Sequence, residues 1–452
     1  MSSAGAPANA DSPEAALDCD VVVIGGGPAG SAAAAWLARA GRRVIVVERS
    51  QFPRFHIGES LLASVNDALA AIGAADIVRK AGFPQKWGAT FLTADGSLER
   101  YADFSVASAV ASPQTWQVER SRFDHLLLQH AASSGADVRE RTQALDVDFD
   151  PSGVSVSTRT GDGNRAVLRA ACVIDASGRD TLLSRKFDLR LPEPRLANVA
   201  VFSHYSGVPR AEGRRSGDIR IVARPDLGWF WLIPISTELM SVGVVLPQSA
   251  MKATGADFDP TDFLEARIAE TPAVGRLLAH AKREWPVRVE RDFSFGSRAY
   301  AGDRWLLAGD AGSFLDPVFS TGVAIALESG VEAAQAADAA LASGHLSRAQ
   351  FSRYERRQQQ RYRSFRRFVI GFYTPEFRDL FFAEDPPPRM FGALVTVFAG
   401  YWHPPWRVRL WVRAFFALMR VQKLVGFTPH IFPGAADVGQ ARAAAGQDAK
   451  SS

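Results

Sequence analysis

One glycine-rich segment near the start of the chain limits the possible folds more than any other feature. The motif Gly25-x-Gly27-x-x-Gly30 follows a run of β-branched residues at 20–24 and precedes an alanine-rich segment at 31–40. The β-branched run predicts a buried parallel strand, and the alanine-rich segment predicts a helix. A further β-branched run at 43–47 predicts a second strand, which ends at an acidic residue. This order within about thirty residues is typical of a dinucleotide-binding unit.

Each glycine of the motif has its own physical role. The first permits a tight turn, the second lets the backbone approach a pyrophosphate, and the third lets the helix pack close to the strand. The helix N-terminus then stabilises phosphate charge. Glu48 can accept hydrogen bonds from a ribose 2′-OH and disfavours a 2′-phosphate, so FAD or NAD is expected rather than NADP. We assign to this part of the site Gly25, Gly27, Pro28, Ala29, Gly30, Glu48 and Arg49.

A second acid selects FAD between these two cofactors. Residues 302–311 read as a strand that ends at Asp310, before the start of a helix. A carboxylate in that place can hold a ribityl hydroxyl, which only the flavin has. A plain strand-end cap is the alternative, but the glycine turn far upstream favours the flavin.

Composition excludes several other classes of function. Among 452 residues there are only two cysteines, Cys19 and Cys172, and no CxxC, which excludes a disulfide-reductase dithiol and a cysteine-rich zinc site. The net charge of +4 is too weak for a typical nucleic-acid binder. The first 16 residues lack the pattern of a secretory signal, and no apolar run reaches the roughly 20 residues of a membrane span. We therefore expect a soluble, cytoplasmic protein.

The element pattern predicts an α/β fold with an α+β insert. Strands at 198–205, 218–223, 229–234 and 240–246 predict a sheet inserted between segments of the dinucleotide-binding domain. We expect the FAD-binding domain to comprise 18–95, 112–190 and 299–342, and the sheet domain, which would bind substrate, to comprise 96–111 and 191–298. A helical C-terminal domain is expected at 343–433, with a disordered leader at 1–17 and a disordered tail at 434–452.

Four motifs together resemble those of flavin-dependent halogenases, a branch of the FAD monooxygenases with the p-hydroxybenzoate hydroxylase fold. The resemblance covers about residues 20–336. Besides the glycine motif it rests on FPRFHIGES at 52–60, GWFWLIP at 228–234 and FLDPVFSTG at 314–322. The last two fit the WxWxIP and FxxPxxSxG signatures of halogenases. The resemblance implies a Rossmann-type FAD-binding domain of the hydroxylase kind with an inserted antiparallel sheet and a helical arm.

The resemblance also implies a mechanism. In the family, reduced FAD and O2 give a C4a-hydroperoxide, which a halide attacks to form hypohalous acid. The acid crosses a tunnel to a lysine and then halogenates an electron-rich carbon. Lys86, in FPQKWGATF at 83–91, matches that lysine, and burial would lower its pKa toward usefulness. A solvated surface lysine is the alternative, and Lys80, at a predicted helix end, fits that description better.

Further roles are assigned on the same resemblance. Ser60, Arg120, Asp310, Pro317 and Gly322 are expected beside the flavin. The backbone at Ser320, Thr321 and Gly322 is expected to hold chloride or bromide, because successive amides at a turn into a helix form an anion site. A simple helix cap is compatible with that role. The tunnel and substrate pocket are expected to include Trp229, Trp231, Pro234 and Phe319. The two tryptophans share one face of a strand, where core packing is the alternative.

One departure from the family points to the substrate. Tryptophan halogenases carry a glutamate directly before the Ser-Thr-Gly, where this chain has Phe319. Without that carboxylate the substrate should supply its own activation, as phenols and pyrroles do. The expected reaction is therefore chlorination or bromination of a phenolic or pyrrolic ring, free or bound to a carrier protein, with FADH2 from a separate flavin reductase. The alternatives are an aromatic hydroxylase or epoxidase that uses NAD(P)H, and a prenyl reductase of the geranylgeranyl reductase kind.

The C-terminal arm permits several interpretations. Residues 353–367 carry seven arginines, and an aromatic-rich stretch follows. A solvated helical face is the plainest reading. Docking to an acidic carrier protein or to a flavin reductase, contact with a membrane surface, and a lid over the substrate pocket are the others. We favour the lid.

Overall fold

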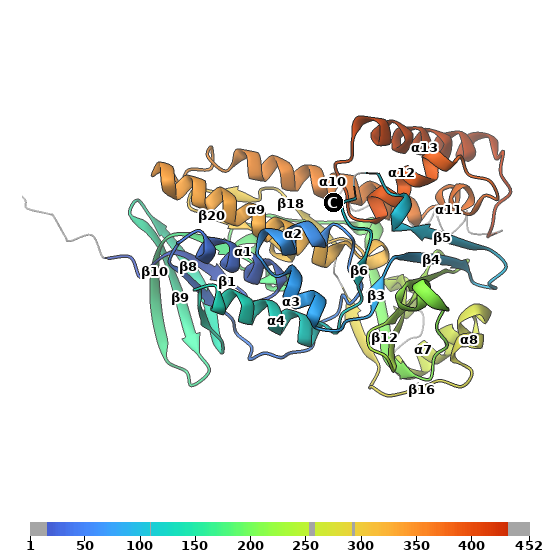
Figure 1. The fold of residues 1–452 in the computed structure, drawn as a ribbon, viewed down its shortest axis with the longest axis horizontal. Helices are drawn as coiled ribbons and strands as arrows, with labels where there is room; N and C mark the ends of the chain where they lie inside the picture. The colour runs from blue at the N-terminus through green and yellow to red at the C-terminus, as the bar shows by residue number, and fades with distance from the viewer. Residues whose placement is uncertain (1–15, 109, 253–257, 292–293, 433–452) are drawn as a thin grey trace, which may run out of the picture.

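The valine-rich runs on either side of the glycine turn form the centre of a parallel sheet in the computed structural model (Figure 1). The model describes residues 16–432 apart from 109, 253–257 and 292–293, so the predicted tail and all but the end of the predicted leader lie outside the described residues. The sheet order is β19 (Ala301–Gly302), β20 (Trp305–Leu307), β10 (Arg165–Asp175), β1 (Cys19–Ile24), β2 (Val44–Val47) and β7 (Asp137–Arg139), and the antiparallel strands β9 (Gly153–Thr160) and β8 (Thr142–Asp150) extend it from β10.

Both faces of this sheet are covered, which explains why its strands are apolar throughout. Val21 and Val23 face the helices α1 (Pro28–Arg39), α4 (Arg120–Ser133) and α9 (Thr321–Ser343). Val22 and Ile24 face the opposite layer, which contains side chains of β8, β9 and α5 (Leu182–Lys186). The predicted Rossmann-type α/β architecture is thereby confirmed.

A second sheet contains the inserted strands that the sequence predicted. Its order is β16 (Lys282–Arg283), β12 (Asn198–Ser206), β15 (Leu239–Pro247), β14 (Trp229–Pro234), β13 (Ile219–Ala223), β4 (Gly88–Thr93) and β5 (Glu99–Asp103), and β17 (Arg288–Arg291) also pairs with β12. We expected residues 88–95 in the FAD-binding segments. Instead β4 pairs in parallel with β13 and antiparallel with β5, so these residues lie in the second sheet.

Two helical stretches of the chain are each divided into two helices. The first consists of α2 (Val65–Ala71) and α3 (Ala75–Lys80), because Gly73 between them has a left-handed φ of +75°. The second consists of α7 (Pro260–Ala269) and α8 (Pro272–Leu278), because a proline cannot continue the first helix. The remaining short elements are β3 (Gln85–Lys86), β6 (Thr115–Trp116), β11 (Arg190–Pro192), β18 (Phe295–Ser297) and α6 (Gln248–Lys252).

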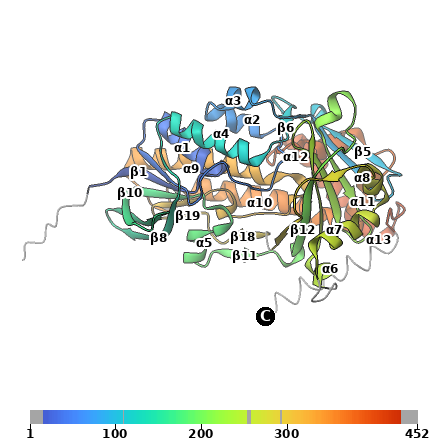
Figure 2. The ribbon, with the colours of Figure 1, turned by 90° about the horizontal axis from the view of Figure 1, so that it is seen from below.

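The C-terminal arm begins with α10 (Ser352–Phe372), which runs beside α9 (Figure 2). The arginines of α10 do not form a uniformly solvated face. Arg361 is 1% exposed and pairs with two acids of α9, Glu328 at 3.3 Å and Glu332 at 2.8 Å. Burial raises the pKa of Glu328 to about 7, against the opposing effect of Arg361. Arg353, Arg356, Arg363 and Arg367 are exposed.

The rest of the arm packs on the second sheet. It consists of α11 (Pro375–Phe382), α12 (Pro388–Phe398) and α13 (Trp406–Val425). Arg378 of α11 is fully buried, and its guanidinium donates hydrogen bonds to the carbonyl oxygens of Arg224 (2.6 Å) and Leu227 (2.9 Å) just before β14. It also donates to Phe372 O within the arm. A single side chain therefore ties the arm to the turn that leads into β14.

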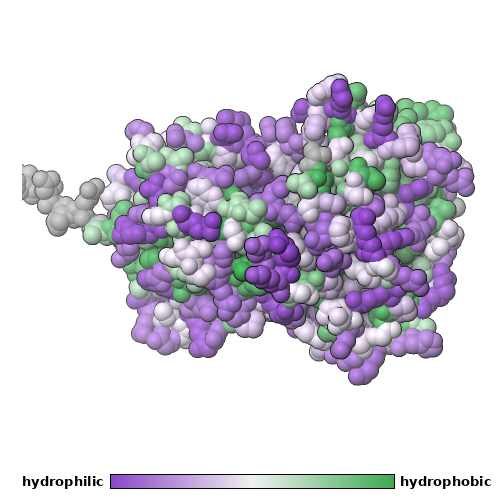
Figure 3. Space-filling model, in the orientation of Figure 1, coloured by the Kyte–Doolittle hydropathy of each residue, from purple (hydrophilic) through white to green (hydrophobic). Residues whose placement is uncertain are grey.

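The outer side of α13 combines apolar and basic residues. Trp406, Leu410 and Leu424 are between 58% and 84% exposed, and the helix contains no acidic residue. Figure 3 shows apolar surface at the end of the molecule where Figure 1 places this helix. Among the residues that the structure describes, none of the helices combines the length and apolar character that a membrane span requires.

The Arg378 contacts predict a large loss of stability on truncation. Arg378→Ala would leave three or more buried carbonyl groups without a donor, so the free energy of unfolding should fall by roughly 3 kcal/mol. Denaturant unfolding would measure this. Arg363→Ala, which truncates an exposed arginine of α10, is the matched control and should change stability by less than about 0.5 kcal/mol. Equal effects of the two substitutions would contradict the assigned role of Arg378.

Candidate active site

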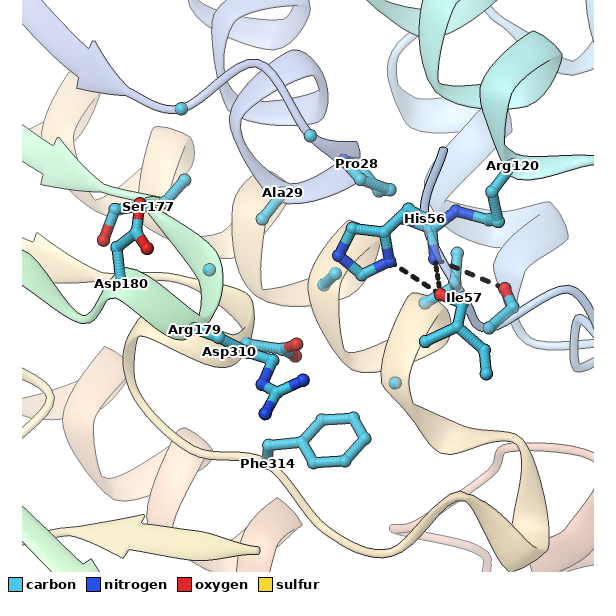
Figure 4. A pocket seen from close by; sticks show the side chains of 18 of the residues that line it. Pro28, Ala29, His56, Ile57, Arg120, Ser177, Arg179, Asp180, Asp310 and Phe314 are labelled. Carbon is cyan, nitrogen blue, oxygen red and sulfur yellow. Dashed lines mark hydrogen bonds between the residues drawn. The ribbon is translucent and has the colours of Figure 1, made fainter. Parts of the chain in front are cut away.

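A cavity of about 690 Å³ lies where the carboxyl ends of β1 and β20 meet the second sheet. Its walls come from the glycine turn, the polar loop at 54–60, the N-terminus of α9 and one face of β14. Figure 4 shows Pro28 and Ala29 on one wall, Asp310, Arg179 and Phe314 on another, and His56, Ile57 and Arg120 on a third. Ligand sites of open α/β sheets typically lie at this edge.

The glycine turn has the geometry that a pyrophosphate requires. Gly25 has a φ of +99°, and a Cβ there would lie 2.4 Å from Ala176 O. A Cβ on Gly30 would lie 1.8 Å from Gly25 O, so only glycine lets α1 approach the strand this closely. Gly27 lines the cavity at the start of α1, and its first close neighbour in that direction is the Arg54 side chain at 3.5 Å. The backbone of the turn is therefore accessible where a phosphate would approach.

Glu48 is held at the end of β2 by two backbone amides. Its carboxylate accepts hydrogen bonds from Gly26 N at 2.7 Å and from Ser50 N at 2.8 Å, and it lines the cavity. Each carboxylate oxygen retains acceptor capacity for a ribose hydroxyl. Arg49 also lines the cavity and pairs with Asp180 at 2.5 Å.

Asp310 and Arg120 stand on opposite walls of the cavity. Burial raises the pKa of Asp310 to about 6, and the positive charges of Arg120 and Arg179 oppose that effect. Arg120 donates to both oxygens of Asp124 (2.7 and 2.9 Å) and to Ile57 O (2.7 Å). Asp310 lies three residues beyond the end of β20, in a short 3-10 helix, rather than at the strand end that the sequence predicted. Glycines at a turn, this acid and an arginine in one cavity fit the parts of FAD.

Several cavity residues were not assigned from the sequence. Arg54, His56 and Glu59 come from the loop at 54–60, whose polar character was the available signal. Burial lowers the pKa of His56 to about 4, with Arg120 as a further cause. Glu59 is 3% exposed and hydrogen-bonds His204 Nε2 at 3.0 Å, a contact between distant segments that no local pattern indicates.

Lys86 does not line the cavity but lies directly behind Ser60, which does. Its Nζ donates to Ser60 Oγ and to Leu61 O, both at 2.8 Å, and the residue is 1% exposed. Among the described residues it forms no ion pair. Burial lowers the pKa of Lys86 to about 7, although the carboxylate of Asp218 opposes this effect. Lys80, by contrast, is exposed at the end of α3.

The turn into α9 has the backbone geometry of an anion site. Ser320 has a left-handed φ of +56°, and its N–H donates a hydrogen bond to Pro317 O at 2.8 Å. Thr321 and Gly322 follow as the first residues of α9, so their N–H groups have no acceptor within the helix. Pro317, Ser320 and Gly322 line the cavity, whereas the Thr321 side chain is buried beside it.

The four residues expected in the tunnel separate into two groups. Trp229 and Trp231 line the cavity from one face of β14, with ring centroids 5.9 Å apart. Pro234, an odd number of residues away from both, belongs to the opposite face and does not line the cavity. Phe319 does not line it either. Its ring stacks on Phe398 at 4.6 Å within the arm.

The comparisons with known proteins agree with this geometry. Residues 18–368 match the family model described as an FAD binding domain. The 1H-pyrrole-2-carbonyl-[peptidyl-carrier protein] chlorinase of Pseudomonas fluorescens is 33% identical over 82% of this chain and 87% of its own. The corresponding brominase of Pseudoalteromonas luteoviolacea is 35% identical over 70% and 76%.

A solved structure extends the agreement to the fold. The crystal structure of CmlS, a flavin-dependent halogenase, superimposes with a TM-score of 0.76 at 30% identity, over 96% of this chain and 78% of its own. The predicted cofactor, FAD, and the predicted halogenase activity are both confirmed by these relatives. The chain with the buried lysine behind its flavin cavity therefore belongs to the flavin-dependent halogenases.

Proposed function

We propose that this halogenase installs chloride or bromide on a phenolic or pyrrolic ring, and that Lys86 delivers the halogen. The observation that supports this proposal most strongly is the burial of Lys86 without a paired carboxylate. A lysine is rarely buried, and an ordinary structural lysine would be exposed or ion-paired. Keeping one buried behind the wall of the flavin cavity costs stability, which points to a chemical role.

The protonation of Lys86 suits that role. With a pKa near 7, a substantial share of its amine is neutral at neutral pH. Bound reduced FAD with O2 supplies the oxidation that converts halide to hypohalous acid. The neutral Nζ can then take the halogen from that acid, with hydroxide leaving, while the protonated form can donate a hydrogen bond to it. Transfer to a ring carbon returns the amine, and the ring loses a proton.

The other site residues support the same reaction. In this proposal the glycine turn, Glu48, Arg49, Ser60, Arg120 and Asp310 bind FAD, and the free amides of Thr321 and Gly322 hold the halide at the N-terminus of α9. The first sheet with its helices forms the flavin domain. The second sheet and the arm enclose the substrate.

We infer that the substrate is tethered to a carrier protein. Two relatives that match most of this chain are named for a pyrrole-2-carbonyl group on a peptidyl carrier protein. Phe319 occupies a place where tryptophan halogenases have a glutamate, and its ring is packed into the arm. The substrate ring must therefore supply its own activation, as a pyrrole nitrogen does. A separate flavin reductase as the source of FADH2 is part of this proposal.

Replacement of Lys86 should separate halogenation from flavin binding. Lys86→Ala should lower halogenation by roughly 10²- to 10⁴-fold, the range for a positioned proton-transfer group, because none of the other described lysines lies behind Ser60. FAD binding, measured by flavin fluorescence, should stay unchanged. Lys80→Ala is the matched control and should retain activity. Full halogenation by Lys86→Ala would refute the proposed role.

The carrier tether can be tested with one acyl group in two forms. Pyrrole-2-carboxylate loaded on a carrier protein should be halogenated at least about 10-fold faster than the free acid, because remote contacts with the carrier contribute to transition-state binding. Mass spectrometry with chloride and with bromide would show the isotope pattern. NADPH without a reductase should give no product. Equal rates for the free acid would exclude recognition of the tether.

The cost of burying Lys86 should appear in the stability of the protein. The pKa of Lys86 is lowered in the folded state, so its destabilising effect is complete below pH 7 and disappears as the pH rises from 7 toward 10.5. Lys86→Met should therefore raise the free energy of unfolding by about 2 kcal/mol at pH 6, after the loss of two hydrogen bonds, and by less at pH 9. Denaturant unfolding at both pH values would show this, and Lys80→Met should show no such trend.

A further inference from the structure

A buried carboxylate, that of Asp218, accepts hydrogen bonds from the backbone directly after Lys86. Asp218 is 5% exposed and precedes β13. Its Oδ1 accepts hydrogen bonds from Trp87 N at 2.6 Å and Gly88 N at 3.0 Å. Its Oδ2 accepts a hydrogen bond from Tyr101 Oη at 2.8 Å. Both oxygens are thus engaged, and one of them fixes two consecutive peptide groups next to the lysine.

We propose that Asp218 is a positioning residue for Lys86. Its carboxylate holds the strand of the lysine in place, and its negative charge favours the protonated form of the lysine amine. The inference rests on the proposed role of Lys86 in halogen transfer. It assigns to the second sheet a part in the chemistry beyond forming a wall of the cavity.

The strand that carries Lys86 needs such support. β3 is two residues long and pairs only with the equally short β6 among the described strands. On its other side, Gly217 lies so close that a Cβ would be 2.0 Å from Gln85 O. Gln117 Nε2 donates to Gly217 O at 2.9 Å and closes this arrangement. β3 is therefore held between β6 and the 217–218 segment.

The charge of Asp218 acts on the lysine as well. Burial lowers the pKa of Lys86, and Asp218 is the group that opposes this effect. Burial raises the pKa of Asp218 in turn, and its three hydrogen bonds and Lys86 oppose that. Other charged or titratable groups near this site include Tyr101, Asp103, Arg214 and Arg215. Both arginines have acidic partners near the surface, Asp103 for Arg214 and Glu99 for Arg215.

Asp218→Asn separates the two roles. Asparagine keeps the size and one acceptor oxygen for the amides but removes the charge. The Lys86 titration should then move to lower pH by on the order of 1 unit. Asp218→Ala also removes the anchor and should lose roughly a further 10-fold in halogenation at its own optimum pH. Tyr101→Phe leaves the charge of the carboxylate in place and is the control, so it should move the titration much less than Asp218→Asn does.

The experiment measures the lysine directly and through catalysis. The chain has seven lysines, so ¹³C-labelled lysine in the FAD-loaded protein gives few signals, and Lys86→Ala identifies the one of interest. Its titration would be followed by NMR in each variant. The pH profile of halogenation would be recorded with pyrrole-2-carbonyl pantetheine, and its Lys86-dependent limb should move with the NMR midpoint.

The outcomes are distinguishable. An unchanged NMR midpoint in every Asp218 variant that folds would overturn the inference. A shifted midpoint with a pH profile that stays in place would also overturn it, because the charge would then have no effect on the reaction. Full activity of Lys86→Ala would instead refute the proposed function, whatever Asp218 does to the NMR signal.

Discussion

The structure around Lys86 depends on burying an amine that forms no ion pair within the part of the chain that the structure describes. Among the described residues, the acceptors of Lys86 Nζ are a hydroxyl and a carbonyl oxygen. Asp218, whose charge opposes the fall in the pKa of Lys86, is itself bound by two amides and a tyrosine. A buried cation is costly, so the amine loses its proton near neutral pH. The backbone around Lys86 is held in place instead by the pairing of two short strands and by a close contact at a glycine.

The flavin side of the site follows from a different constraint, the need to stabilise negative charge. Two helices, α1 and α9, begin at the same cavity, so both present backbone amides to it. One is suited to a pyrophosphate and the other to a small anion. Close packing of these helices requires small residues, as at Gly330, where a Cβ would lie 2.3 Å from Ala29 O.

The arm joins these two regions. Tyr373 accepts a hydrogen bond from Trp229 Nε1 at 2.7 Å and donates to Asp316 at 2.8 Å, so one side chain of the arm contacts both halogenase signatures. Phe319 is enclosed by aromatic rings of the arm, and Arg378 fixes the arm to the start of β14. These contacts place the arm behind the walls of the cavity, and none of its described residues lines the cavity itself, so its role as a lid stays a prediction.

The local sequence determined those parts of the structure that depend on interactions between residues close together in the chain. The glycine turn, the covered parallel strands and the acid at the end of β2 follow from steric limits and from periodicity within thirty residues, so the fold class and FAD were predictable. The four-residue spacing of Arg120 and Asp124 on one helix also indicates the ion pair that they form. Only the tertiary structure decided where β4 belongs and that Phe319 packs into the arm. It also decided that Ser60 contacts Lys86 and that Asp218 binds the two amides after it. Those contacts join segments 26 to 131 residues apart, and their energies depend on burial, which no local pattern contains.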